Sequence, residues 1–135
     1  MSSSNGNQSA LSLIGRILLA VTFIMSGLGK LGAPSATQGY IAAMSMPAPL
    51  LAYLGAVIVE VGGGAMLLVG YRTKLVAIVL ALFCVVTALI FHRNFADQTQ
   101  MVMFLKNVSI AGGFLLLVAH GAGPLSLDRR SAKKP

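Results

Sequence analysis

Glu60 is the side chain in this sequence with the clearest capacity for chemistry. It is the only acidic residue before Asp97, and it lies in a run from Pro49 to Gly70 whose other residues are apolar, small or tyrosine. A carboxylate at bilayer depth costs about 2.5–3.5 kcal/mol on insertion scales. A chain that keeps such a group therefore gives it a charged partner, a proton or a role in binding.

Helical spacing predicts that Glu60 faces other helices rather than lipid. Positions i and i+4 of a helix share one face, and on this face they carry the small residues Ala52, Ala56 and Gly64. Small residues on a membrane helix allow a neighbouring helix to approach closely. Glu60 is therefore expected inside a helix bundle.

Three polar residues from other apolar runs are predicted to join Glu60 in an intramembrane polar cluster: Arg16, Lys106 and Asn107. A rise of about 1.5 Å per residue places Glu60 about 16 Å below the outer face, Lys106 about 9 Å below it, and Arg16 about 6 Å beyond Glu60. Long basic side chains span such gaps, so we expect an ion pair of Glu60 with Lys106 or with Arg16. Such a cluster serves either as a functional site or only to fix the helix register.

A second candidate site lies at the outer ends of the apolar runs, where Lys30 ends the first run and His92 follows the third. A histidine there can bind a quinone headgroup or relay a proton. The alternative is that these polar residues only end the spans in the headgroup region. No Cys/His spacing in the chain indicates haem, an iron–sulfur cluster or zinc, so no metal site is predicted.

Four apolar runs must position these side chains. They cover residues 13–31, 49–70, 75–91 and 101–119. Each has the length of about 17–25 residues that crosses a bilayer as a helix. The runs are continuous rather than alternating, and lipid demands internal backbone hydrogen bonds, so helices are favoured over strands.

The predicted fold is therefore all-α: an antiparallel four-helix transmembrane bundle. Its domain covers residues 12–128, between a flexible polar tail at 1–11 and a basic tail at 129–135. The long connection from Gly32 to Ala48 is expected to hold either a short helix on the membrane surface or an irregular loop.

The composition supports a membrane protein. Only 10% of the residues are charged and 56% are hydrophobic, whereas a soluble domain has about 25% charged residues. The net charge of +7 does not indicate nucleic-acid binding, because the basic residues form no continuous face. Their excess in the 72–74 turn and the 129–134 tail instead predicts that both termini are cytoplasmic.

The order of several short motifs resembles a known family. The motifs are RILL (16–19), FIMSGLGKL (23–31), EVGGG (60–64), LVGYRT (68–73), FHRNF (91–95), FLKN (104–107), GGFLLL (112–117) and GAGPLSLD (121–128). Together they resemble the DoxX family of four-span bacterial membrane proteins, and most closely its YqjF-type members. The resemblance covers nearly the whole chain and implies a location in the cell inner membrane.

The resemblance also implies a setting for function. Some DoxX relatives are the small membrane subunit of a thiosulfate:quinone oxidoreductase, and others are associated with membrane redox or detoxification complexes. We therefore expect an anchor or accessory subunit with a polar intramembrane pocket, rather than an enzyme on its own. The alternatives are a quinone-interacting subunit of an oxidoreductase and a small-solute permease.

The expected partners follow from this setting. They are the lipid bilayer, a soluble oxidoreductase and a second copy of the chain, and nucleic acid is not among them. No cofactor is evident in the sequence, and quinone is the ligand to consider.

Overall fold

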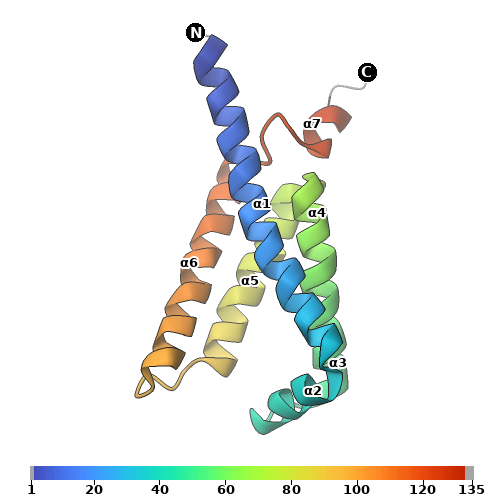
Figure 1. Cartoon of the computed structure of the whole chain (residues 1–135), viewed down its shortest axis with the longest axis vertical. Helices are drawn as coiled ribbons and strands as arrows, with labels where there is room; N and C mark the ends of the chain where they lie inside the picture. The colour runs from blue at the N-terminus through green and yellow to red at the C-terminus, as the bar shows by residue number, and fades with distance from the viewer. Residues whose placement is uncertain (1, 133–135) are drawn as a thin grey trace.

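Helices account for most of the chain in the computed structural model, which describes residues 2–132 and their side chains from residue 6 onward (Figure 1). The helix bounds are α1 Ser2–Gly32, α2 Pro34–Ala43, α3 Pro49–Val57, η1 Ile58–Gly62, α4 Gly63–Val69, α5 Thr73–Phe91, α6 Gln98–His120 and α7 Leu127–Ser131. Because α3, η1 and α4 follow one another without a break, they form one continuous span.

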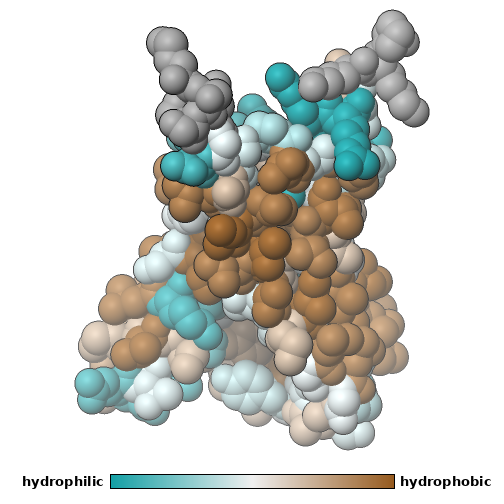
Figure 2. Space-filling model, turned by 45° about the horizontal axis from the view of Figure 1, so that its top comes forward, coloured by the Kyte–Doolittle hydropathy of each residue, from teal (hydrophilic) through white to brown (hydrophobic). Residues whose placement is uncertain are grey.

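Four of the described helical segments are long and apolar enough to cross a membrane. They are Gly6–Gly32, Pro49–Val69, Thr73–Phe91 and Gln98–His120. Hydrophobic side chains gather over the middle of the face shown in Figure 2, and hydrophilic ones lie mostly toward its ends. A surface of this kind is suited to lipid. The predicted all-α, four-helix membrane fold is confirmed.

The four spans are arranged as two groups that meet at a small core. Helix α1 packs along the α3–η1–α4 span, and α5 and α6 form an antiparallel hairpin that contacts the rest through α4 and η1 (Figure 1). Phe23 of α1 and Phe114 of α6 join the two groups, with ring centroids 5.3 Å apart. Toward the end that carries α2 the groups spread apart (Figure 1).

The small residues of α5 form a packing stripe along one face of the helix. Ala77, Ala81, Cys84 and Ala88 are all buried. Small side chains let the neighbouring spans approach closely, so α5 lies at the centre of the fold. Cys84 therefore belongs to the apolar core.

Proline, glycine and one carboxylate set the ends of the helices. Pro34 and Pro49 stand in the first turns of α2 and α3, where a missing N–H costs nothing. Gly70 ends α4 with a φ of +69°, a left-handed conformation that favours glycine. Asp97 caps α6 by accepting hydrogen bonds from the backbone N–H groups of Thr99 and Gln100, at 2.8 and 3.4 Å.

Both described ends of the chain lie at the same end of the bundle (Figure 1). That they face the cytoplasm stays a prediction. Helix α1 continues back to Ser2 through the segment predicted as a polar tail, and α7 spans the predicted boundary at residue 128. Residues 133–135 of the predicted basic tail lie outside the described residues. The domain boundaries therefore stay predictions, while the connection after α1 contains α2 rather than only an irregular loop.

Candidate functional site

The centre of the candidate site is a π-helical turn in the middle of the second span. This turn, η1, carries Glu60, whose residue surface is only 4% exposed. A π-turn inserts extra backbone into an otherwise regular helix and occurs frequently at functional sites. The carboxylate is thus held within the bundle by a local irregularity of the helix.

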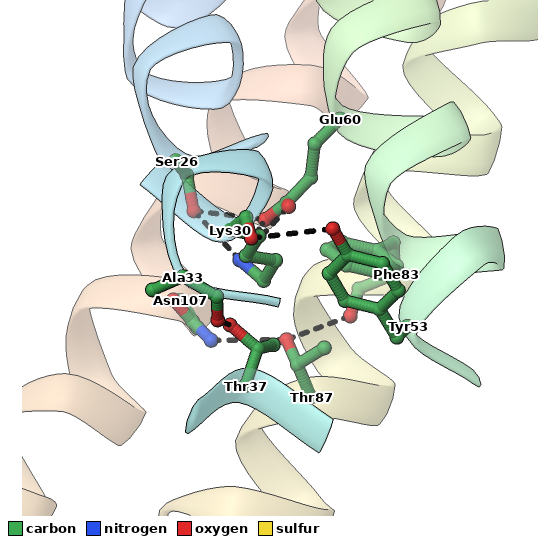
Figure 3. Close-up of polar contacts among 9 residues, drawn as sticks. All are labelled: Ser26, Lys30, Ala33, Thr37, Tyr53, Glu60, Phe83, Thr87 and Asn107. Carbon is green, nitrogen blue, oxygen red and sulfur yellow. Dashed lines mark hydrogen bonds and ion pairs between the residues drawn. The ribbon is translucent and has the colours of Figure 1, made fainter. Parts of the chain in front are cut away.

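The carboxylate of Glu60 is paired with Lys30 and Ser26 of α1. Lys30 Nζ donates a hydrogen bond to Oε1 at 2.9 Å and lies 2.8 Å from Oε2. Ser26 Oγ donates to Oε1 at 2.9 Å and accepts from Lys30 Nζ at 3.0 Å. Figure 3 shows Glu60 pointing from the second span toward both side chains. Oε2 has the Lys30 charge beside it but accepts no hydrogen bond from the described residues.

A glycine on α1 makes this contact possible. A Cβ at Gly27 would lie 2.5 Å from Val61 Cγ2 and 3.1 Å from Glu60 Cβ, so only glycine allows α1 to lie this close to η1. At this crossing the flanking residues Ser26 and Lys30 reach the carboxylate. The phenol of Tyr53 adds a hydrogen bond to the carbonyl of Lys30, at 3.3 Å.

The predicted pairing of Glu60 with Lys106 or Arg16 is therefore wrong. Counting residues assumed that all spans begin at one level. The contact with Gly27, however, puts Glu60 only five residues from the end of α1 at Gly32, or about 7.5 Å, against about 16 Å from the start of α3. Lys30, two residues before the end of α1 at Gly32, is thus at a depth from which its side chain reaches Glu60.

Arg16 belongs to a different cluster, at the end of the bundle where the termini lie. It is 1% exposed, and its Nη2 donates to the carbonyl of Leu125 at 2.6 Å. Asp128 lies near it and accepts hydrogen bonds from the backbone N–H groups of Arg72 and Thr73, at 2.7 and 2.9 Å. This cluster fastens the segment after α6 to the turn between α4 and α5.

The charge of Asp128 is stabilised at this position. Burial acts to raise the pKa of its carboxyl, but the hydrogen bonds from Thr73 and Arg72 and the charge of Arg16 together outweigh it. The pKa of Asp128 therefore lies below its ordinary value, and the group remains an acceptor at neutral pH.

Lys106 and Asn107 point in different directions from α6. Asn107 Nδ2 donates to Thr87 Oγ1 of α5 at 3.1 Å, which links the two helices. Lys106 is exposed, and its Nζ contacts Met103 Sδ at 3.4 Å. Lys106 and Ser109 are both exposed, and the buried face of α6 instead holds Ala111 and Phe114.

His92 lies directly after α5, at the C-terminal end of that helix. Its Nδ1 is 2.8 Å from Gln100 Oε1, a contact that holds the first turn of α6 against the end of α5. The second predicted site paired His92 with Lys30, but Lys30 is instead committed to Glu60. The two residues nevertheless line one cavity.

This cavity has a volume of about 600 Å³ and unites most of the predicted polar residues. It is lined by parts of all four spans and by α2. The polar or ionisable lining includes Ser26, Lys30, Glu60, Thr87, His92, Lys106 and Asn107. Apolar walls are formed by side chains such as Phe83 and Ile110, and Tyr40 of α2 stacks on Phe91 at one end, with ring centroids 5.5 Å apart.

The arrangement can bind an amphipathic small molecule. Pockets of about 300–1,000 Å³ with apolar walls and a few placed polar groups are typical small-molecule sites. Lys30, whose side chain is 27% exposed on the cavity wall, can donate to a carbonyl of such a ligand. Of the four residues predicted to form the intramembrane cluster, Glu60, Lys106 and Asn107 line the cavity, whereas Arg16 does not.

Sequence reasoning missed Ser26, Thr87 and the true partner of Glu60. A signal for the pair was present, since Ser26 and Lys30 are four residues apart and flank Gly27. Aligning the small residues of the first span with those around Glu60 in antiparallel order would have brought Lys30 to the carboxylate.

Comparison with known proteins gives consistent matches along the chain. The sequence model of the DoxX family matches residues 11–93. Inner membrane protein YqjF of Escherichia coli (strain K12) is 42% identical over 122 residues, which cover 90% of this chain and 92% of that protein. Inner membrane protein YphA of the same organism is 39% identical over 126 residues, or 89% of each chain. No solved structure matches significantly.

Proposed function

This chain belongs to the DoxX family, as its motifs indicated, and we propose that it is an inner-membrane accessory subunit that holds a quinone or a similar amphipathic molecule for a redox or detoxification partner. The relatives named above are inner membrane proteins, which supports that location. In this proposal the partner is a soluble oxidoreductase, and the membrane chain supplies the binding site for the lipid-soluble reactant.

One observation carries the proposal: the ion pair of the buried Glu60 with the half-buried Lys30 lies on the wall of a cavity of about 600 Å³. An ion pair that only fixed the helix register would need no open space beside it. Here the space is open, and Ser26 and Lys30 line it together with Glu60.

The chemistry of this wall suits a quinone. A quinone carries carbonyl acceptors and its reduced form carries hydroxyl donors, so Lys30 and Glu60 match the two forms respectively. Reduction of a quinone consumes protons, and a carboxylate within hydrogen-bond reach is a common proton donor or acceptor. The apolar walls accommodate the ring and the start of the tail.

Filling the cavity tests the proposal. Gly55 lines the cavity, and a Cβ there meets no atom within 4 Å, so Gly55→Trp places a large side chain in the space without clashing at its root. Gly112→Trp is the matched control, because a Cβ at this α6 glycine also meets nothing within 4 Å and the residue does not line the cavity. Both variants should fold.

The measurement is mass spectrometry of the lipids that remain with each protein after purification in a mild detergent. Quinone or another amphiphile should co-purify with the wild type and with Gly112→Trp, and should fall about tenfold in Gly55→Trp, which corresponds to about 1.4 kcal/mol of lost affinity. A ligand-free wild type, or equal retention by the two variants, would contradict the proposal.

Glu60→Gln separates a binding role from a packing role. If the protein accumulates and folds normally but retains less ligand, the carboxylate serves the site. Loss of the protein itself from the membrane would indicate that the ion pair acts only in assembly.

A further inference from the structure

Among the described residues, Lys106 is the charged group on the cavity wall whose charge no other side chain balances. It lies eight residues into α6, about 12 Å along the helix from Gln98. Its ammonium contacts only the thioether of Met103, at 3.4 Å, among the contacts of the described residues. A thioether is a weak acceptor and does not neutralise a positive charge.

The chain has no carboxylate to offer Lys106. The sequence contains three acidic residues, Glu60, Asp97 and Asp128. Glu60 is bound by Lys30, Asp97 caps the start of α6, and Asp128 caps α5 at the opposite end of the bundle. The three carboxylates are thus committed elsewhere.

The cavity therefore carries one positive charge more than it neutralises. Lys30 and Glu60 cancel each other, whereas Lys106 adds an ammonium to the same wall. A charged lysine within a membrane span is costly and normally faces a partner or a polar cavity. Asn107, the next residue of α6, also lines the cavity, and its amide donates to the hydroxyl of Thr87 on α5. Much of the remaining lining is apolar, with Phe83 and Ile90 of α5 among its residues.

We propose that Lys106 is the anion subsite of the cavity and binds the acidic head of a single-chain amphiphile, such as a fatty-acid carboxylate. The head pairs with the ammonium near Asn107, and the apolar body lies along α5. This inference rests on the proposed function, because it uses the same cavity, and it names the ligand class. The alternative is that Lys106 binds no anion in the cavity and only extends its ammonium toward the lipid headgroups.

The test compares an acid with its neutral ester. The protein is placed in phosphatidylcholine nanodiscs, and binding of cis-parinaric acid and of its methyl ester is followed by their fluorescence, with empty discs as the blank. We expect the wild type to bind the acid about tenfold more tightly than the ester, which is about 1.4 kcal/mol. Lys106→Gln should bind the two equally, and Lys106→Arg should keep the preference. Arg93→Gln, which removes an exposed charge outside the cavity, should also keep it.

The outcomes separate this inference from the proposed function. Equal binding of acid and ester by the wild type, or an unchanged preference in Lys106→Gln, overturns the anion subsite but leaves the cavity as a binding site. Failure of both probes to bind the wild type overturns both. A further arm adds phosphatidylglycerol to the discs. Competition that depends on Lys106 would identify a lipid headgroup as the source of the anion, and its absence would leave the free acid.

Discussion

Replacing Lys30 by Met should destabilise the protein more than replacing Glu60 by Gln, although the two side chains form one ion pair. The reason is their unequal burial, because the side chain of Glu60 is 5% exposed and that of Lys30 is 27% exposed. Lys30→Met leaves a buried carboxylate with Ser26 as its one hydrogen-bond donor among the described residues. Glu60→Gln leaves an ammonium close to the end of α1, from which it can extend toward water.

The magnitudes follow from that difference. Removing one partner of a buried pair typically costs about 3–5 kcal/mol, and we assign this range to Lys30→Met. Glu60→Gln keeps a polar group that Ser26 can still bond, so its cost should be about 1–3 kcal/mol. The double variant holds neither charge and should cost less than the sum, with a coupling energy of about 2–3 kcal/mol.

The assay is reversible equilibrium unfolding in mixed micelles, followed by far-ultraviolet circular dichroism. It is applied to the wild type, the two single variants and the double variant. Lys106→Met is the control, since it removes a lysine that has no ion partner among the described residues, and it should not destabilise the protein. Additive single effects, with a coupling below about 0.5 kcal/mol, would refute the reasoning. A larger loss of unfolding free energy for Glu60→Gln than for Lys30→Met would refute the inference that the buried carboxylate is the more unfavourable charge to leave unpaired.

Two further predictions concern packing and pH. Gly27→Ala should destabilise the protein by about 1–3 kcal/mol in the same unfolding assay, because the added Cβ would lie 2.5 Å from Val61 Cγ2. Gly29→Ala is the control: its Cβ would meet no atom within 4 Å, so the substitution should be neutral or slightly stabilising. Equal effects of the two substitutions would contradict the close contact between α1 and η1. Because the folded-state pKa of Asp128 is lowered, its contribution is fully present above the unfolded value of about 3.9 and is lost as the pH falls through the folded pKa. Asp128→Asn should lower the free energy of unfolding by about 1 kcal/mol at pH 7, as loss of a helix cap does. It should also flatten the decline of that free energy below about pH 4. An unchanged decline in the variant would contradict the assigned role of Asp128.

The fold could be read from the sequence because lipid leaves few choices. Apolar runs of span length with no place for unpaired backbone groups dictate membrane helices, and the four predicted runs correspond to the four spans. The small-residue stripe of α5 was also visible, since Ala77, Ala81, Ala88 and Cys84 recur at helical spacing. The π-turn at Glu60 was not, because no residue type requires it.

The sequence predicted which residues belong to the site better than it predicted which of them contact one another. Glu60, Lys106 and Asn107 do line one cavity, but the partner of Glu60 depends on how far α1 and α3 are offset along the membrane normal. That offset arises from the packing of Gly27 against η1, a tertiary contact that residue counting cannot supply. Arg16 was misplaced for the same reason, and its binding to the segment after α6 could not be foreseen from the spacing within one span.

Photo-crosslinking tests the central claim, ligand binding in the cavity, most directly. A diazirine-bearing single-chain amphiphile is activated in nanodiscs that contain the full chain, and the adducts are mapped by mass spectrometry. The account predicts adducts on cavity residues in the segments 22–30, 55–60 and 83–92, which are lost in Gly55→Trp and retained in Gly112→Trp. Adducts spread over lipid-facing residues such as Leu115 and Leu116, at the same level in both variants, would contradict it.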